Sequence, residues 1–410
     1  MLSLNFLSDD MRRDPFPIYD HLRANGPVMF EPQSGLWMIF DYAGVRQALS
    51  DTDAFASDLA SVAAHPTPPW LVFNDPPRHT KLRNIISQAF TPRMVAALEP
   101  RIAALSQELL GRSIERGEMD LAADFSIPLP MRVIAEMIGI PDKDWPCYVR
   151  WSNATLKLSY TIRGISPGGD VTAQAMSEYS DALAEMRAYL PRLIDERRSK
   201  AQPRERGDSA GDLLDRLVAA EVDGERLSPE ELLGFFQLLI VGGQETTTNL
   251  INNAVLCLLE NPDQLALLRR SPERLATAIE EVLRYRSPFQ FVFRGTRREV
   301  EVHGQTIPAG KLVLLMLGSA NRDPKQFPDA DRFDMTRDPN PHLAFGHGIH
   351  FCLGAGLSRL EARVALADLI HRLPGLELAT SEPWQPRPAL HVHGPLRLPV
   401  RFQTPSHLFA

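Results

Sequence analysis

Apolar and polar residues recur with the period of a helix over most of the chain. The longest such stretch runs from Ser228 to about Leu259, is dominated by apolar and small residues, and stops before Asn261-Pro262. Its start is predicted by the tetrapeptide 228–231, which offers an N-cap serine, a proline at the first helical position and a glutamate that completes a capping box. A helix of about 30 residues is roughly 45 Å long, so it must cross the core. Shorter helical patterns cover residues 14–26, 42–49, 94–116, 131–138, 144–158, 177–200 and 271–286.

Strand-like runs are short and lie near the start of the chain and in its last third. Val28–Phe30 and Leu36–Phe40, separated by the turn residues Pro32–Gly35, predict a hairpin. Later runs of the same character are Phe289–Arg294, Val300–Val302, Lys311–Leu317 and Leu390–Pro399. The expected fold class is therefore mainly α with small β-sheets (α+β).

The length of the chain, 410 residues, would allow about two or three domains by size alone. Its most polar run, Lys200–Ala210, is short and falls between helical patterns, and the chain shows no internal repeat. We therefore expect a single large domain over residues 1–410, with a β-rich N-terminal part at roughly 14–60.

Charge and composition narrow the expected partners. The formal net charge is −7, which argues against a nucleic acid partner. The first residues lack the basic start and apolar run of a signal peptide, and the apolar stretch Leu232–Val241 is too short to span a bilayer. The three cysteines, Cys147, Cys257 and Cys352, do not form a disulfide framework pattern. We expect a cytoplasmic protein with no membrane partner.

The segment Phe345–Gly354 contains three glycines in ten residues and carries Cys352 near its end. Its backbone can lie close to a flat ligand. A helical pattern, Leu357–Val364, follows, and a thiolate near a helix N-terminus is stabilised by the helix dipole and by free N–H groups. Two other interpretations are open: a buried cysteine that acts as a small hydrophobe, and a zinc cluster. The zinc cluster would use His342, His347, His350 and Cys352, but the chain has no second cysteine nearby and no paired ligand spacing.

The spacing of Phe345, Gly348, His350, Cys352 and Gly354 resembles the haem-binding loop of the cytochrome P450 superfamily, the haem-thiolate monooxygenases. The resemblance implies haem b (iron protoporphyrin IX) with Cys352 as its axial iron ligand, and the triangular-prism fold of the family. Thiolate ligation donates electron density to the iron and favours cleavage of the O–O bond.

Two further segments resemble haem-contacting parts of that family. In 75–92, His79 and Arg83 are four residues apart and share one helix face. Such a pair is usually solvated, but the resemblance implies that it binds the haem propionates. Arg294 takes a matching position after Pro288, so that His79, Arg83, Arg294 and His350 would be donors to two carboxylates.

The central helix contains the sequence Gly242–Thr248. The two glycines weaken the helix, and the Thr246 hydroxyl can bond the carbonyl of Gly242 and open the backbone ladder. Alternatively, a glycine there lets another helix approach closely. The pair Glu245 and Thr246 resembles the proton-delivery pair of the family, within its Gly-x-acid-Thr pattern.

An acid and a base three residues apart, Glu281 and Arg284, form an ExxR pattern that is weak evidence by itself, because exposed pairs contribute little. The later segment Phe327–Phe333 resembles the part of the family that supplies a third member. The resemblance implies a buried structural network of Glu281, Arg284 and Arg332.

The implied function is a bacterial-type monooxygenase that activates O2 with two electrons from a ferredoxin-type partner and its NAD(P)H-dependent reductase. We expect the partner to dock on the Cys352 side, near Arg78 and Lys81. The substrate is expected to be a largely apolar small molecule such as a terpenoid, steroid, macrolide or fatty acid. The candidate substrate contacts are Leu71, Leu238, Val241, Gly242, Gln290, Val292 and Val392.

Residues Asn153–Ile165 and the turn at Pro167–Gly169 fit a flap over the site, and Lys157 or Arg163 could anchor a fatty acid. Two alternative functions are a peroxide-driven haem-thiolate peroxygenase and a non-catalytic haem sensor or carrier. The presence of Glu245 and Thr246 argues against both, since neither function needs that pair.

Overall fold

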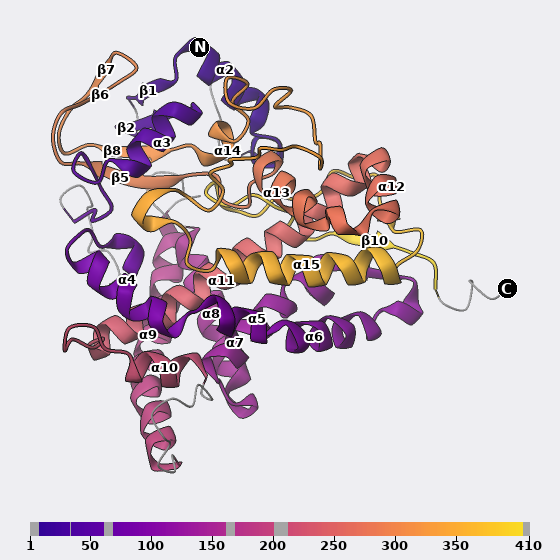
Figure 1. Cartoon of the computed structure of the whole chain (residues 1–410), viewed down its shortest axis with the longest axis horizontal. Coiled ribbons are helices and arrows are strands. Elements are labelled where there is room, and N and C mark those ends of the chain that lie inside the picture. The colour runs from indigo at the N-terminus through magenta and orange to yellow at the C-terminus, as the bar shows by residue number, and fades with distance from the viewer. Residues whose placement is uncertain (1–7, 33, 61–68, 161–168, 201–211, 405–410) are drawn as a thin grey trace.

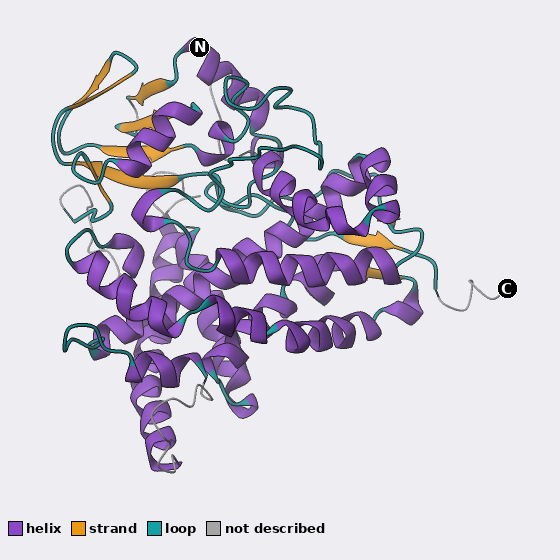
Figure 2. Cartoon of the chain, in the orientation of Figure 1, coloured by secondary structure: helices purple, strands orange, loops and turns teal. Residues whose placement is uncertain are grey.

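The structure is a computed structural model that describes residues 8–32, 34–60, 69–160, 169–200 and 212–404. Helices make up most of it (Figure 2). They are α1 (Asp9–Arg13), α2 (Phe16–Asn25), α3 (Tyr42–Ser50), α4 (Arg78–Ala89), α5 (Pro92–Ala97), α6 (Glu99–Gly111), α7 (Pro128–Ile138), α8 (Trp145–Ser159), α9 (Gly169–Lys200), α10 (Leu213–Ala219), α11 (Pro229–Glu260), α12 (Pro262–Arg270), α13 (Leu275–Tyr285), α14 (Leu317–Ala320) and α15 (Ala355–Arg372).

The strands form three small sheets, and the largest lies at one side of the molecule beside α3 (Figure 1). Its strand order is β1-β2-β8-β5-β3, in which β2 and β8 are parallel and the other neighbours are antiparallel. A second sheet has the order β4-β10-β9, and β6 pairs with β7. The strands are β1 (Val28–Glu31), β2 (Leu36–Ile39), β3 (Phe55–Ala56), β4 (Glu118–Asp120), β5 (Val292–Thr296), β6 (Val300–Val302), β7 (Gln305–Ile307), β8 (Leu312–Leu315), β9 (Glu377–Leu378) and β10 (Pro399–Arg401). The mainly α fold with small sheets is confirmed.

Helix α11 is the long apolar helix predicted from the sequence; it begins at Pro229 after the N-cap Ser228, as expected, and ends one residue later than expected. The Ser228 side chain accepts from the backbone N–H of Glu231, and the Glu231 carboxylate accepts from the backbone N–H of Ser228, so the capping box is present. Most of its side chains are buried, and it packs against α7, α8, α13 and α15. Because it crosses the core, residues near its middle are held in the interior of the molecule.

The predicted hairpin is formed by β1 and β2, with Val28 paired to Ile39 and Glu31 paired to Leu36. Gly26 ends the preceding helix with a φ of 154°, a conformation that costs a glycine little. The parallel pairing of β2 with β8 then brings the start of the chain to Leu312–Leu315. This sheet therefore fixes the position of β5, whose residue Arg294 is a candidate for the site.

Two local predictions were wrong, and a third stays a prediction. The helical pattern over residues 94–116 is divided into α5 and α6, where Pro100 sits in the first turn of α6. In the predicted flap, Asn153–Ser159 are the last residues of α8, as the helical pattern over 144–158 predicted, and residues 161–168 lie outside the described residues. The run Leu390–Pro399 is not a strand apart from its last residue, and only single bridges join Phe289 to Val392 and Pro386 to Pro395. Prolines interrupt this segment and cannot donate to a strand ladder.

None of the described helices combines the length and apolar content that crossing a membrane requires.

Candidate active site

The cysteine loop is shaped by glycines with positive φ. Gly346 and Gly348 have φ values of 73° and 70°. A Cβ on Gly348 would lie 2.9 Å from the backbone oxygen of Leu49, so the loop lies directly against the end of α3. The loop closes where the backbone N–H of Cys352 donates to the carbonyl of Phe345 at 2.9 Å, and α15 begins three residues later at Ala355. Sequence and structure therefore agree on a tight loop that presents Cys352 just before a helix.

The Cys352 side chain lies deep in the protein and still has accessible surface. Burial raises the pKa of its thiol, while backbone N–H groups of Gly354 and Ala355 and the guanidinium groups of Arg83 and Arg359 lower it. Because the side chain is exposed, packed side chains do not cover the sulfur and it is open to a ligand. A thiolate at this position would be favoured by the loop and the two arginines, and a bound cation would offset the cost of burial.

Four candidate cofactor-binding side chains lie together near this cysteine. The imidazole rings of His79 and His350 are 4.2 Å apart between centroids. The charges of Arg83 and Arg294 act on both histidines, and Arg83 also donates to the carbonyl of Phe351 at 2.8 Å. Burial, followed by Arg294 and His79, lowers the pKa of His350 to about 3, so this imidazole is neutral. The structure thus brings residues from α4, β5 and the cysteine loop to one place.

Two members of this group are buried without the partners that their chemistry calls for. Both ring nitrogens of His79 lack a hydrogen-bond partner, although the side chain is only 2% exposed. Arg294 is 7% exposed and donates to the carbonyl of Phe293, and among the described residues no carboxylate lies within ion-pair distance of it. Burial lowers the pKa of Arg294 to about 10. A buried guanidinium needs an anionic partner, and a buried neutral imidazole needs hydrogen-bond partners, so these residues fit a ligand with carboxylate groups.

Helix α11 presents an accessible stripe to the interior at Leu238, Val241, Gly242 and Thr246. The Thr246 hydroxyl donates to the carbonyl of Gly242 at 2.7 Å, as the sequence predicted. The helix assignment is continuous from Pro229 to Glu260, and the local widening stays a prediction.

The two adjacent glycines of α11 have different environments. A Cβ on Gly243 would lie 2.5 Å from Cδ1 of Ile134 in α7, whereas a Cβ on Gly242 would meet nothing closer than Leu238 Cδ1 at 4.0 Å. Gly243 therefore permits close approach of α7, the alternative interpretation considered from the sequence. Gly242 leaves the interior face of the helix open.

Glu245 is buried and is directed away from Thr246. Its carboxylate accepts a hydrogen bond from the Tyr160 hydroxyl, and Arg387 Nη1 lies 3.7 Å from its Oε1. Burial raises the pKa of Glu245, while Arg387 and the Tyr160 hydrogen bond lower it. The sequence did not predict Tyr160 or Arg387, since one ends a helix and the other lies in an irregular segment without a motif.

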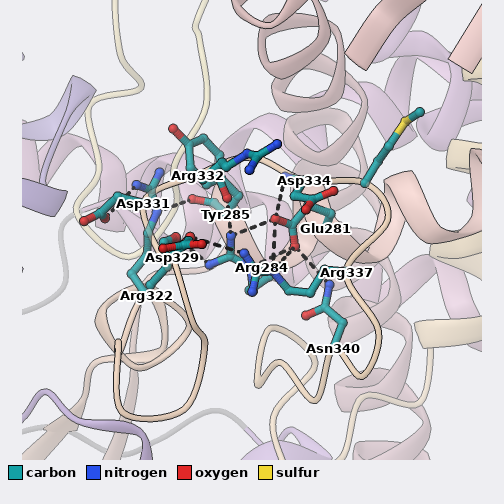
Figure 3. A network of polar contacts seen from close by, with 12 residues as sticks. Glu281, Arg284, Tyr285, Arg322, Asp329, Asp331, Arg332, Asp334, Arg337 and Asn340 are labelled. Atoms are coloured by element: carbon teal, nitrogen blue, oxygen red, sulfur yellow. Dashed lines mark hydrogen bonds and ion pairs between the residues drawn. The ribbon is translucent and has the colours of Figure 1, made fainter. Parts of the chain in front are cut away.

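The ion-pair network of α13 is present, but its third side chain is Arg337 rather than Arg332. Arg284 donates to both oxygens of Glu281 at 2.7 and 2.8 Å, and both side chains are fully buried. Arg337 Nε lies 3.3 Å from Glu281 Oε2, and Asn340 donates to the same oxygen at 3.1 Å (Figure 3). The side chain of Arg332 is exposed, and that residue contributes only its carbonyl, which accepts from Arg284 at 3.0 Å. The prediction for Arg332 was wrong because the turn around Asp329 directs its side chain outward.

The candidate substrate residues outside α11 differ in burial. Leu71 on the short helix η1 (Leu71–Phe73) and Val392 are buried, and Val292 is half-buried on β5. Gln290 points elsewhere, since its amide donates to the carbonyl of Ser287 at 2.7 Å and fills the space left by Gly318. The sequence missed His391, whose ring lies 5.5 Å from that of Phe289 and whose pKa burial lowers to about 4.

The family described as Cytochrome P450 matches this chain over residues 170–271 and 273–397. The chain belongs to the cytochrome P450 family.

Individual relatives match nearly the whole of this cytochrome P450. It is 39% identical to Cytochrome P450 monooxygenase PikC of Streptomyces venezuelae, over 98% of this chain and 94% of that protein. It is 38% identical to Vitamin D(3) 25-hydroxylase of Pseudonocardia autotrophica, over 95% of this chain and 94% of that protein. The crystal structure of CYP109E1 from Bacillus megaterium in complex with testosterone superposes with a TM-score of 0.84 at 36% identity, over 95% of this chain and 99% of that one. The protein is therefore a cytochrome P450 monooxygenase, and its cofactor is haem with a cysteine thiolate as axial ligand.

The three cysteines of this cytochrome P450 differ in their suitability as that ligand. Cys257 is fully buried in α11, where burial raises the pKa of its thiol to about 11. Cys147 lies on α8 and is half-buried. Only Cys352 is exposed, and the Arg83 charge that acts on its thiol also acts on His79 and His350. The alternative of a zinc site finds no support, because no group of three metal-ligating side chains is found in the described part of the chain.

Three cations predicted to contact ligands or partners have partners within the chain. Lys81 Nζ lies 2.5 Å from Glu225, and Arg78 pairs with Glu225 and Glu231 near the start of α11. Lys157 pairs with Glu178 of α9 at 2.7 Å, and its side chain is more than half exposed. Arg163 lies outside the described residues. The side chains of Arg78 and Lys81 are nevertheless partly exposed, so their role in docking a redox partner stays a prediction, whereas Lys157 is exposed and paired and is not placed as an anchor inside the site.

Proposed function

We propose that this cytochrome P450 hydroxylates or epoxidises a largely apolar small molecule at a haem b whose iron is bound by Cys352. His79, Arg83, Arg294 and His350 hold the haem propionates, and Phe345, Gly348 and Gly354 shape the loop around the sulfur. The observation that carries this proposal is a pair of buried groups near the exposed Cys352, in which Arg294 has no ion-pair partner among the described residues and His79 has no hydrogen-bond partner. The bound haem supplies the activation of O2 that no side chain can provide.

The chain's own residues position the substrate, exclude water and deliver protons. Thr246 and Glu245 are the proposed proton-delivery pair, with the Thr246 hydroxyl held by the carbonyl of Gly242 on the accessible face of α11. Electrons come from a separate ferredoxin-type protein and its NAD(P)H-dependent reductase. A location in the cytoplasm and a single domain over the whole chain stay predictions.

The substrate is proposed to be neutral and bulky, with a steroid-like skeleton as the first candidate and a terpenoid, macrolide or fatty acid as further ones. The side chains are apolar at Leu238, Val241 and Val292, and the cation Arg387 is committed to Glu245. The names of a vitamin D(3) hydroxylase and of a testosterone complex among the relatives support this choice.

The test of the haem assignment compares Cys352→Ser with Cys147→Ser. We expect the first variant to lose the absorption band of the reduced carbon monoxide complex that is typical of thiolate-bound haem, and the second to keep it. Loss of the band in neither variant would show that Cys352 is not the ligand.

The substrate class is tested by optical titration of the ferric protein with steroids, terpenoids, macrolides, fatty acids and small aromatic acids. A shift of the haem iron to high spin is expected with the neutral ligands, which are the steroids, terpenoids and macrolides. A shift with small aromatic acids alone would contradict the apolar site.

The alternatives of a peroxide-driven peroxygenase and of a non-catalytic haem sensor are separated by Thr246→Ala. If the protein is a monooxygenase that uses Glu245 and Thr246, the variant forms less product for every two electrons consumed and releases more peroxide. A peroxygenase or a sensor would show no such change.

A further inference from the structure

Glu245, the acid of the proposed proton-delivery pair, contacts two polar side chains from outside α11. Tyr160, which follows the last residue of α8, donates its hydroxyl proton to Glu245 Oε1, and Arg387 approaches the same oxygen from the C-terminal segment. Glu245 is 4% exposed and Arg387 is 7% exposed, so water competes little for these contacts.

Arg387 is fixed in its place by several contacts. Its Nε donates to Asn249 Oδ1 at 2.9 Å, and its backbone carbonyl accepts from Arg12 Nη1 at 2.8 Å. Gly394 packs so closely on Asn249 that a Cβ there would lie 2.6 Å from Asn249 Oδ1. Arg387 is therefore held firmly in place, whereas Tyr160 lies at the end of α8.

Glu245 and Thr246 do not face each other. Successive residues of an α-helix point in directions about 100° apart. The Thr246 hydroxyl donates to Gly242, the Glu245 carboxylate accepts from Tyr160, and no hydrogen bond joins the two side chains in the described structure. The carboxyl group must therefore leave Tyr160 before it can turn toward the Thr246 side of α11.

We propose that Tyr160 is a positioning residue for proton delivery: its hydroxyl holds the Glu245 carboxyl beside Arg387 and away from Thr246, and opening of this hydrogen bond frees the acid to act. The proposal rests on the proposed function and specifies how its proton-delivery acid is controlled. In this proposal Tyr160 donates no proton to the substrate or to oxygen and acts only by holding Glu245.

The expected effect on protonation follows from the groups that face Glu245. Burial raises its pKa, and the Arg387 charge and the Tyr160 hydroxyl oppose this effect. His391 also lies near Tyr160, with ring centroids 6.4 Å apart, and its low pKa keeps it neutral. Removing the hydroxyl leaves Arg387 alone against burial, so the pKa of Glu245 must rise.

The test is an infrared pH titration of the protonated carboxyl band in the ferric holoprotein, for the wild type and Tyr160→Phe. Glu245→Gln identifies the band of Glu245, which is necessary because burial also raises the pKa of Glu361 and gives it a band of its own. The matched control is Tyr148→Phe on the same helix, since the Tyr148 hydroxyl is buried without a partner.

In Tyr160→Phe the midpoint is expected to move upward by about one pH unit, with no movement in Tyr148→Phe. The pH dependence of product formed per electron pair should move in the same direction. An unchanged midpoint in Tyr160→Phe, or an equal shift in the control, overturns the proposal. The thiolate band of the reduced carbon monoxide complex is recorded on the same samples. Its absence in the wild type would defeat the proposed function, whereas its presence with an unchanged midpoint defeats only the role of Tyr160.

Discussion

Arg337 and Glu281 form an ion pair with Nε 3.3 Å from Oε2, in which the arginine side chain is 11% exposed and the glutamate has no exposed surface. This contact makes Arg337, and not the exposed Arg332, the third side chain of the network. We expect Arg337→Ala to lower the free energy of unfolding by about 1–3 kcal/mol, because it removes a hydrogen-bonded partner of a buried charge. Arg332→Ala should change it by less than about 0.5 kcal/mol.

Chemical denaturation of the two variants checks this assignment. Equal losses of stability in both would contradict it.

The two adjacent glycines of α11 should respond in opposite ways to alanine. Gly243→Ala places a Cβ against Ile134 in a packed core and is expected to destabilise the protein by about 1–3 kcal/mol. Adding Ile134→Val should recover part of this loss. Gly242→Ala meets no close atom and gains helix propensity of up to about 1 kcal/mol.

Thermal unfolding measures the stability of both glycine variants. An optical titration of Gly242→Ala with ligands reports whether the added methyl group on the accessible face of α11 affects binding. The expectation fails if Gly242→Ala is the more destabilising of the two.

Arg294 is a buried guanidinium whose expected partner is a carboxylate of the cofactor. We expect Arg294→Leu to lower haem affinity by about tenfold to a hundredfold, because a hydrogen bond to a charged group is lost. The unfolding free energy of the haem-free protein should not fall, since an unpaired buried charge disfavours folding.

Transfer of haem to an excess of apomyoglobin measures the affinity of the Arg294 variant. Arg298→Leu is the control, because Arg298 is exposed and pairs with Asp51 at 3.6 Å. Similar rates of haem loss from both variants would refute the role of Arg294.

Glu280 predicts a loss of stability in acid. Burial alone would raise its pKa, but hydrogen bonds from Arg359 and His342 outweigh burial and lower it to about 2. A carboxylate with a lowered folded-state pKa stabilises the fold above its unfolded pKa, and this contribution is lost as the pH falls from about 4.5 towards 2. Glu280→Gln should therefore be less stable than the wild type at pH 6, and the difference should shrink at pH 3.

Urea unfolding at these two pH values tests the prediction for Glu280. Glu99→Gln is the control, because Glu99 is half-exposed where it pairs with Arg363 at 2.9 Å. A difference that stays constant between the two pH values would rule out this role of Glu280.

Features set by short-range patterns were predicted well from the sequence. The capping box of α11, the hairpin of β1 and β2 and the cysteine loop all depend on residues a few positions apart. The Thr246 bond to Gly242 was also predicted, because it spans a single helical turn.

Features set by long-range packing were not predicted. Tyr160 meets Glu245 from a position 85 residues away, and Arg387 meets Asn249 from a position 138 residues away. Arg337 was missed because Arg332 and Arg337 both lie in an irregular segment, and the path of that segment decides which side chain reaches Glu281. Gln290 was assigned to the site because the space beside Gly318 that holds its amide cannot be seen in the sequence.

The parallel pairing of β2 with β8 has a consequence for how the protein is made. Trp37 pairs with Val313 and Ile39 with Leu315. During translation β2 therefore has no parallel partner until β8 is synthesised, on the order of tens of seconds later. Until then the nascent hairpin of β1 and β2 carries an open edge that can pair with other chains. Because the sheet also positions Arg294, the cofactor-binding residues come together only late in synthesis, and haem is expected to enter after release from the ribosome rather than during translation.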